Sequence, residues 1–449
     1  MTSGMSPTFS ARRGANCEGV VALSRPCHVW IVNHYADAPD RPSGTRHYDL
    51  ARQLLDRGFE VTVVAAAFNH LTGRDERLRG RRMLRFEEFE GVRFAWLRTF
   101  PYRGNTWRRQ LNMLSFLLVF LVAQARISRP DVVIGSTVHP FAALGAWLVA
   151  RMRGARFIFE VRDLWPQTLV DLGAMSVGSP GERLLRAIES FLVRRASAVI
   201  TLLPGMRLYL AERGLPLEHV TYLPNGVDIA TADLLRASPI SREAGSSEAA
   251  VETLQAITNL RSEGRFVVGY IGSFGRVNAL NTVVEAMRLA DQASPGTIGL
   301  VMIGDGPERP ALVRQAADIA GLHLGGPVPK HEVQAMLATL DAGLIHATET
   351  PVYRYGISFN KLFDYMAASL PIVFACTSEQ DPVRLAEAGI SLAPDDPVAL
   401  ATSLLALAAL DAETIAEMGA AGRRYVVREH DMKGHGGALA ALVDCGTPS

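Results

Sequence analysis

Lysine is nearly absent from this chain of 449 residues. Three lysines, Lys330, Lys361 and Lys433, stand against 43 arginines. A cation that only decorates the surface would be expected to be an arginine here. The lysine in GISFNKLFDYMAASLPIV (356–373) is therefore the first candidate for a specific function.

Other scarcities exclude whole classes of protein. The four cysteines (Cys17, Cys27, Cys376, Cys445) lack the spacing of metal ligands, so we expect reduced thiols in a cytosolic protein. A net charge of +1 gives no general signal for nucleic-acid binding, and no nucleic-acid partner is expected. The uncharged apolar stretch at 110–125 is shorter than the roughly 20 residues of a membrane span.

That stretch, QLNMLSFLLVFLVAQA, has arginines on both sides (Arg108, Arg109, Arg126), and residues 74–109 hold eleven arginines against five acids. Two interpretations of the stretch stay open: a helix buried against a sheet, or a helix that also touches a membrane surface. The arginines form either a solvated basic face or a patch that attracts anionic lipid or a phosphate-bearing acceptor.

The length favours two domains, and the periodicity agrees. Strands alternate with helices from HVWIVNH (28–34) onward, stop in a polar segment at 229–264, and restart at RFVVGYIGSFG (265–275). The pattern predicts an α/β protein with two doubly wound parallel sheets, whose ligands bind at the carboxyl ends of the strands in an interdomain cleft.

The predicted boundaries follow from these shifts in composition. They are a disordered leader over 1–25, an N-terminal domain over 26–224, a linker with one helix over 225–264, a C-terminal domain over 265–425, and a helical tail over 426–449. Crossing back to the N-terminal domain is one option for the tail.

Three candidate residues lie in the first half. Gly44 precedes a helix, where it would let a ligand approach the backbone amides. Arg162 and Asp163 end a buried strand in FEVRDLWPQ. Asp163 could orient or deprotonate an acceptor hydroxyl, or pair with Arg162 to hold the loop.

In the second half, YIGSFGRVNAL (270–280) joins a strand to a helix through Gly272 and Gly275. Such a loop can cradle phosphates, but it is not GxGxxG and supports no nicotinamide site. Arg276 could pair with phosphate oxygens or remain in solvent. Asp305, in GDGPE, is expected to cap its turn or the next helix.

The lysine stretch combines several groups. Ser358 is predicted to cap a helix on which Lys361, Asp364 and Tyr365 share a face. Helix amides and a compact cation suit a diphosphate, and a carboxylate suits sugar hydroxyls. The alternative is a plain Lys–Asp surface pair.

Taken together, these segments resemble a known family. SGTRHYDLARQLLDRGFEVTVVAA, FEVRDLWPQ, YLPNGVD, MIGDGPERPAL and NKLFDYMAASLPIV, in order over about 28–430, look like a family 4 glycosyltransferase. More narrowly, they are similar to the bacterial subgroup that adds amino-sugars to lipid-linked O-antigen or capsule precursors. The resemblance implies a GT-B fold of two Rossmann-like domains, with retention of anomeric configuration and neither metal nor cofactor.

The resemblance also implies roles for residues at matching positions. Lys361 and Arg276 would hold the donor diphosphate, Asp364 the ribose hydroxyls, and Gly44 would face the donor from the other domain. The remaining implied positions are the loop residues Gly272, Ser273 and Gly275, Val328 and Pro329 near the base, Arg162 and Asp163 at the catalytic position, and Arg108, Arg109 and His139 on the acceptor side.

Two positions depart from the family pattern: Gly356 stands where relatives often carry a glutamate, and Asn278 where many have a second lysine. The expected partners are a UDP-linked sugar and a lipid-linked or glycan acceptor. The expected location is the cytoplasm or the cytoplasmic face of the inner membrane. A UDP-sugar 2-epimerase and a non-catalytic assembly partner are the alternatives.

Overall fold

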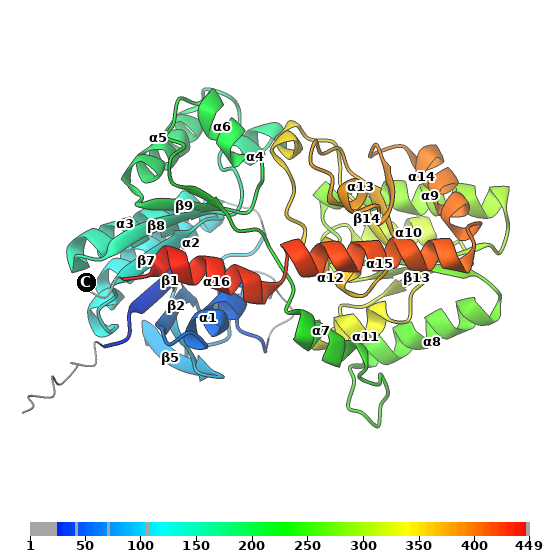
Figure 1. The fold of residues 1–449 in the computed structure, drawn as a ribbon, viewed down its shortest axis with the longest axis horizontal. Helices are drawn as coiled ribbons and strands as arrows, with labels where there is room; N and C mark the ends of the chain where they lie inside the picture. The colour runs from blue at the N-terminus through cyan, green and yellow to red at the C-terminus, as the bar shows by residue number, and fades with distance from the viewer. Residues whose placement is uncertain (1–24, 41–43, 70–71, 105–106, 446–449) are drawn as a thin grey trace, which may run out of the picture.

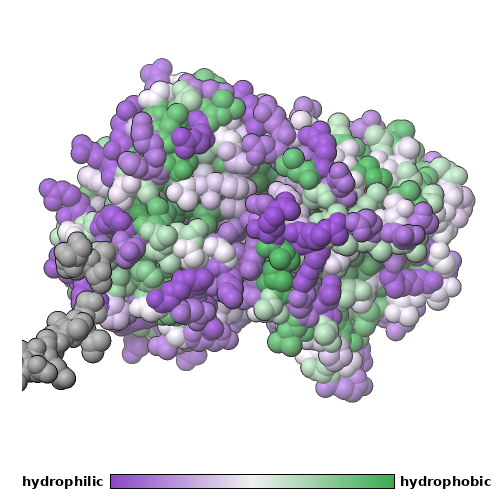
Figure 2. All heavy atoms as spheres, in the orientation of Figure 1, coloured by the Kyte–Doolittle hydropathy of each residue, from purple (hydrophilic) through white to green (hydrophobic). Residues whose placement is uncertain are grey.

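The computed structural model describes residues 25–40, 44–69, 72–104 and 107–445. The predicted leader over 1–25 therefore lies almost wholly outside the described residues. The chain forms two lobes, each built on a central parallel sheet, as the ribbon and the space-filling view both show (Figures 1 and 2). The predicted α/β class with two doubly wound domains is confirmed.

The N-terminal sheet has eight strands, seven of them parallel, and β5 is antiparallel at the edge beside β6. Its spatial order is β10 (Val220–Tyr222), β9 (Ala198–Thr201), β8 (Arg156–Val161), β7 (Val132–Ser136), β1 (His28–Val32), β2 (Glu60–Ala66), β6 (Val92–Leu97) and β5 (Leu84–Phe89). The order reverses direction between β1 and β7, so the carboxyl ends of these two strands mark the switch point where such sheets bind ligands.

Helices cover both faces of this sheet, which explains why β1, HVWIV, is buried along its whole length. They are α1 (Arg46–Leu55), α2 (Trp107–Ala123) with η1 (Gln124–Arg126), α3 (Pro140–Arg153), α4 (Gln167–Asp171), α5 (Pro180–Arg195) and α6 (Met206–Glu212). A short ribbon, β3 (Phe68–Asn69) with β4 (Arg74–Asp75), lies outside the sheet.

The C-terminal sheet is parallel throughout, in the order β13 (Leu322–Gly325), β12 (Ile298–Ile303), β11 (Phe266–Ile271), β14 (Ala342–His346), β15 (Ile372–Ala375) and β16 (Gly389–Leu392). This is the doubly wound order of dinucleotide-binding sheets, with its switch point between β11 and β14. Its helical elements are η2 (Arg276–Asn278), α9 (Leu280–Ala293), α10 (Arg309–Ala316), α11 (Lys330–Leu337), η3 (Pro351–Tyr355), α12 (Asn360–Ala367), α13 (Pro382–Ala386), α14 (Pro397–Ala408) and α15 (Ala412–Glu429).

The segment predicted as a linker with one helix holds two, α7 (Ile229–Arg236) and α8 (Glu248–Ser262). Asp228 caps α7 by accepting a hydrogen bond from the Thr231 amide. Sequence reasoning missed this helix start because the whole segment is polar. α8 packs on β11, β12 and β13, and Ile257 belongs to the C-terminal core. Both helices are thus part of the C-terminal domain.

The two crossings between the domains run side by side. The Val227 amide donates to the His430 carbonyl (2.9 Å), and the Met432 amide donates to the Val227 carbonyl (3.1 Å). After the second crossing, α16 (Met432–Val443) packs against α1 of the N-terminal domain, as Figure 1 shows in red over blue.

A disulfide joins Cys27, the residue before β1, to Cys445, two residues after the end of α16. The prediction of four reduced thiols is therefore wrong for this pair, because residues 418 positions apart in sequence become neighbours only in the fold. Cys376 is free and buried.

A third connection comes from η3, which inserts into the N-terminal domain. Val352 and Tyr355 belong to the N-terminal core cluster together with Met206. The Gly205 amide donates to the Tyr355 carbonyl (2.8 Å). The two domains therefore share a packed contact beside the crossings.

No single described helix is both long and apolar enough to cross a membrane, although α14 and α15 together, bent by 111°, meet that criterion by length and composition.

Candidate functional site

The start of α12 carries the lysine stretch. The helix begins at Asn360, and no side chain caps its first turn. The prediction of Ser358 as the cap is wrong, because the chain is still extended at Phe359 and the helix starts two residues after Ser358. The first-turn amides of α12 are therefore left without a side-chain acceptor.

Lys361 is surrounded by neutral groups. Its Nζ donates to the Tyr270 hydroxyl and to Asn278 Oδ1, each at 3.1 Å, and lies 4.3 Å from the centre of the Tyr270 ring. Burial lowers the pKa of Lys361 to about 7. Among the described residues Lys361 forms no ion pair, so the alternative of a Lys–Asp surface pair is not what the structure contains. A lysine in this setting can take up a proton, and so become charged, when an anion binds beside it.

The glycine loop lies directly beside this lysine. A Cβ built on Gly272 would stand 3.6 Å from Lys361 Nζ. Asn278, which also accepts from Lys361, donates to the Ser273 carbonyl (2.9 Å), and its own carbonyl lies 2.9 Å from Nδ1 of His346. Asn278 thus links the ends of β11 and β14, the switch point of the C-terminal sheet.

Asp364 faces residues of both domains. It accepts from Gln334 Nε2 (3.2 Å), and burial raises its pKa, opposed by the nearby Lys330. Lys330 reaches across the domain boundary and donates to Thr45 Oγ1 (2.7 Å). Two of the three lysines of the chain therefore lie around α12.

Gly44, Val328 and Pro329 also lie at this boundary. A Cβ on Gly44 would stand 3.1 Å from Nδ2 of Asn360, so the glycine directly faces the start of α12. Val328 is buried, and Pro329 immediately precedes α11, which begins at Lys330. Sequence reasoning missed Lys330, although the rarity of lysine was a signal that could have found it.

Arg276 is placed differently. Its side chain is 90% exposed, and Nε lies 3.4 Å from Glu308. Gly275 comes just before it at the start of η2. In this structure the guanidinium of Arg276 therefore lies at the surface and pairs with Glu308.

A buried polar network that sequence reasoning missed fills the switch point of the N-terminal sheet. Glu160 Oε1 accepts from Arg46 Nε (3.0 Å), while Oε2 lies 2.8 Å from His47 Nε2 and accepts from Ser136 Oγ (2.5 Å). Asn33 Nδ2 donates to the Ser136 hydroxyl at 2.8 Å and so joins β1 to β7. Burial alone would raise the pKa of Glu160, but Arg46 and His47 hold it well below its usual range. The sequence feature that could have revealed this network is Glu160 itself, a glutamate inside the apolar strand RFIFEV.

Arg162 and Asp163 follow Glu160 in sequence. Asp163 accepts from Thr168 Oγ1 (2.6 Å) within its own loop, and burial raises its pKa. The Arg162 amide donates to Thr137 Oγ1 (2.9 Å), and burial lowers the pKa of its guanidinium. No Arg162–Asp163 ion pair forms among the described residues, and Asp163 is held instead by hydrogen bonds from its own loop, that of Thr168 among them.

Of the three acceptor-side candidates, His139 is buried, Arg109 is half-buried and Arg108 is exposed. His139 Nε2 lies 2.8 Å from His34 Nδ1, and burial, with a smaller contribution from Arg109, lowers the pKa of His139 to about 3. His139 is therefore neutral at physiological pH. Arg108 is exposed at the start of α2, with its guanidinium 5.4 Å from the centre of the Phe100 ring.

Gly356 has a structural reason to be a glycine. Its φ of 103° is one that other residues rarely adopt, and a Cβ there would come within 2.5 Å of Pro204 Cδ. The contact of η3 with the N-terminal domain therefore occupies the space that a side chain would need. Glu349, the nearest upstream acid, is exposed.

Comparison with known proteins matches both halves of the chain. Residues 43–226 match the family model described as "Glycosyl transferase 4-like domain", and residues 265–409 match "Glycosyl transferases group 1". The two matched ranges contain Arg46, His47, Ser136 and Glu160 of the buried network and the surroundings of Lys361.

Two curated relatives are similar over part of the chain. The putative colanic acid biosynthesis glycosyl transferase WcaI of Escherichia coli K12 is 26% identical, over 58% of this chain and 62% of its own length. The probable glycosyltransferase WbjE of Pseudomonas aeruginosa is 25% identical, over 65% of this chain and 69% of its own. The match thus spans less than two thirds of the first relative.

Solved structures share the fold across nearly the whole chain. Sucrose-phosphate synthase from Thermosynechococcus elongatus superposes with a TM-score of 0.69 at 16% identity, covering 93% of this chain and 98% of its own. HepE from Anabaena, in complex with UDP and glucose, gives 0.62 at 15% identity, covering 93% and 99%. At these identities the likeness establishes the fold.

Proposed function

The chain belongs to the family 4 glycosyltransferases with the GT-B fold, and from this premise we propose which transfer it performs. The proposed reaction moves a sugar from a UDP-linked donor to a lipid-linked saccharide during cell-surface polysaccharide synthesis, with retention of configuration and without a metal. The colanic acid relative supports the polysaccharide context, and the UDP complex of HepE supports the nucleotide.

The observation that carries the proposal is Lys361, a cation held by Tyr270 and Asn278 with no counter-ion among the described residues. It lies beside the Gly272 loop and on the uncapped first turn of α12, at the switch point of the C-terminal sheet. A diphosphate placed there would receive the ammonium and the helix amides together. As the bond from the anomeric carbon to the diphosphate breaks, this charge would stabilise the leaving group, and such electrostatic stabilisation usually contributes most to catalysis.

The other donor contacts follow from the same placement. Asp364, held by Gln334 near Lys330, would accept from the ribose hydroxyls. Val328 and Pro329 would lie against the base, and Gly44 would leave room for the donor on the opposite side. Arg276 would turn from Glu308 toward the diphosphate, a movement that an exposed side chain can make.

On the acceptor side, a hydroxyl would form the new bond to the anomeric carbon as the old one breaks. Its proton would pass to the departing diphosphate on the same face of the sugar, or to Asp163, whose raised pKa suits a base. Neutral His139, with Arg109 nearby, would contact the acceptor.

A panel of nucleotides and nucleotide-sugars tests the proposal by thermal shift. UDP and one UDP-sugar are expected to raise the melting temperature, because a ligand at 100 times its Kd stabilises the folded state by about 2.7 kcal/mol. The shift should persist in Lys433→Ala, whose lysine is exposed on α16. If no nucleotide stabilised the protein, or if a UDP-sugar were isomerised without acceptor, the proposal would fail.

A further inference from the structure

Helix α2 has two apolar faces, and only one of them is covered. Met113, Phe116 and Phe120 are fully buried and face the core beside α3. The opposite face carries large apolar side chains spaced as one helical stripe, and it lies in solvent. The stripe consists of Trp107 (70% exposed), Leu111 (36%), Leu114 (41%), Leu118 (56%) and Val122 (76%).

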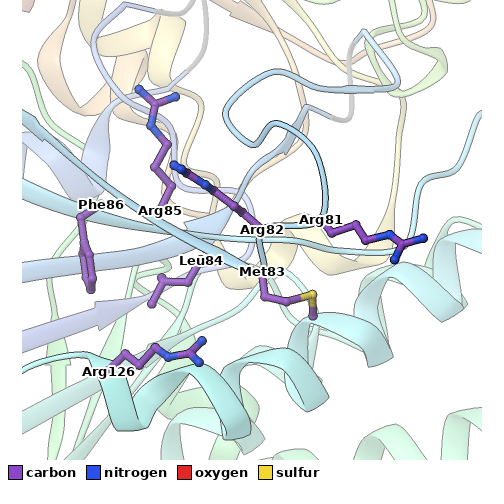
Figure 3. A pocket seen from close by; sticks show the side chains of 7 residues that line it. All are labelled: Arg81, Arg82, Met83, Leu84, Arg85, Phe86 and Arg126. Carbon is purple, nitrogen blue, oxygen red and sulfur yellow. The ribbon is translucent and has the colours of Figure 1, made fainter.

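A basic hollow adjoins the end of this stripe. Arg126, four residues after Val122, lines a hollow of 710 Å³ together with Arg81, Arg82 and Arg85. In Figure 3, Met83 and Leu84 point toward the helix that leads to Arg126, while the guanidinium groups of Arg81, Arg82 and Arg85 spread away from this segment. Arg79 joins Arg82 and Arg85 in lining a second hollow of 410 Å³.

The positive charge of this region is largely uncompensated. Arg81, Arg82 and Arg126 form no ion pair with any described residue, and all three are exposed. Arg85 pairs with Glu87 (3.0 Å). Arg108 extends the charge to the other end of the stripe, where it stacks near the half-exposed Phe100.

We propose that the outer stripe of α2 and the arginines around Arg82 and Arg126 form a docking surface for a bilayer containing anionic lipids. The stripe would lie in the interface with Trp107, Leu118 and Val122 among the acyl chains, while the arginines contact lipid phosphates. An apolar helix face bordered by unpaired arginines has the chemistry of such a surface. A protein partner or a second copy of this basic face would have to supply matching acids.

The orientation has a consequence for the acceptor. Arg109 lies at the start of α2 and near His139, so docking along α2 would hold this side of the N-terminal domain close to the membrane. A lipid-linked acceptor would then reach the site without leaving the bilayer. This consequence rests on the proposed function, whereas docking itself does not.

Flotation of the full chain with vesicles tests the surface. Binding is expected to vesicles of phosphatidylcholine with about 30% phosphatidylglycerol, weak binding to phosphatidylcholine alone, and loss of binding at high salt. The double variant Leu118→Glu/Val122→Glu should weaken partitioning by about tenfold or more. Arg82→Glu/Arg126→Glu should weaken it by about 25-fold, at roughly fivefold per arginine.

Matched controls carry the same substitutions elsewhere. Leu234→Glu/Val398→Glu changes equally exposed apolar residues of the C-terminal domain, and Arg424→Glu/Arg428→Glu changes exposed arginines of α15. Both should float like wild type. Melting temperature and the shift caused by UDP establish that each variant is folded and report separately on the proposed function.

Wild-type protein that stays unbound at low salt would overturn the proposal, as would unchanged flotation of the α2 variant. Light scattering tests whether a second copy of the chain occupies this face. A wild-type dimer that Leu118→Glu/Val122→Glu converts to monomer would assign the face to a second copy and overturn the membrane proposal.

Discussion

Replacing Lys361 by alanine is expected to lower kcat/KM for sugar transfer by about 10²–10³-fold, the usual effect of removing one donor that stabilises developing charge. The reason is local: Lys361 is the cation held between Tyr270 and Asn278 beside the Gly272 loop. Steady-state kinetics with the UDP-sugar identified in the nucleotide panel measures the effect.

The rarity of lysine gives this experiment its control. Lys433→Ala removes an exposed lysine of α16 and should leave kcat/KM unchanged. Lys361→Arg should recover activity only in part, because a planar guanidinium does not reproduce the compact ammonium group that donates to Tyr270 and Asn278. Wild-type activity in Lys361→Ala would contradict the proposal that the donor diphosphate binds at this position.

The second large effect concerns stability. Glu160→Ala should lower the free energy of unfolding of the N-terminal domain by about 3–5 kcal/mol, because it leaves the buried guanidinium of Arg46 without its carboxylate. Urea denaturation monitored by tryptophan fluorescence measures the change, since Trp30 and Trp96 lie in this domain. Glu417→Ala, which removes an exposed partner of Arg424, should change stability by less than about 1 kcal/mol.

The same network predicts a pH dependence. The folded protein holds the pKa of Glu160 well below its unfolded value, so its stabilisation is complete above about pH 4.3 and is lost as pH falls through the folded pKa. The stability of wild type should therefore fall more steeply below pH 4 than that of Glu160→Ala. Parallel curves for the two proteins would contradict this assignment.

Much of this architecture could be predicted from the sequence, since strand and helix periods are local. The alternation predicts both sheets, and the glycine loop and the lysine stretch fall at the switch point of the second sheet. The buried network of Arg46, His47 and Glu160 could not be predicted, because its members lie up to 114 positions apart and meet only through the sheet order.

Long-range contacts account for the other differences. The Cys27–Cys445 disulfide depends on the return of α16 to the N-terminal domain, and the bond from Lys330 to Thr45 depends on how the two domains sit together. The helix start at Asn360 instead of after Ser358 reflects an extended Phe359, a detail of backbone angles that residue preferences do not specify.

The exposed face of α2 is another feature that the sequence alone does not specify. Its apolar run is plain in the sequence, but which side is buried depends on packing against α3. Only the structure separates Phe116 and Phe120 from the outward stripe that ends at Val122.

Calorimetric titration of UDP into the protein, in two buffers of different ionisation enthalpy, tests the central claim most directly. With its pKa lowered to about 7, Lys361 is about nine-tenths neutral at pH 8, and a bound diphosphate should restore its charge. We predict uptake of close to one proton per UDP at pH 8, little uptake at pH 6, and loss of the uptake in Lys361→Ala but not in Lys433→Ala. UDP binding with the same affinity and the same proton uptake in Lys361→Ala would contradict the placement of the donor at α12.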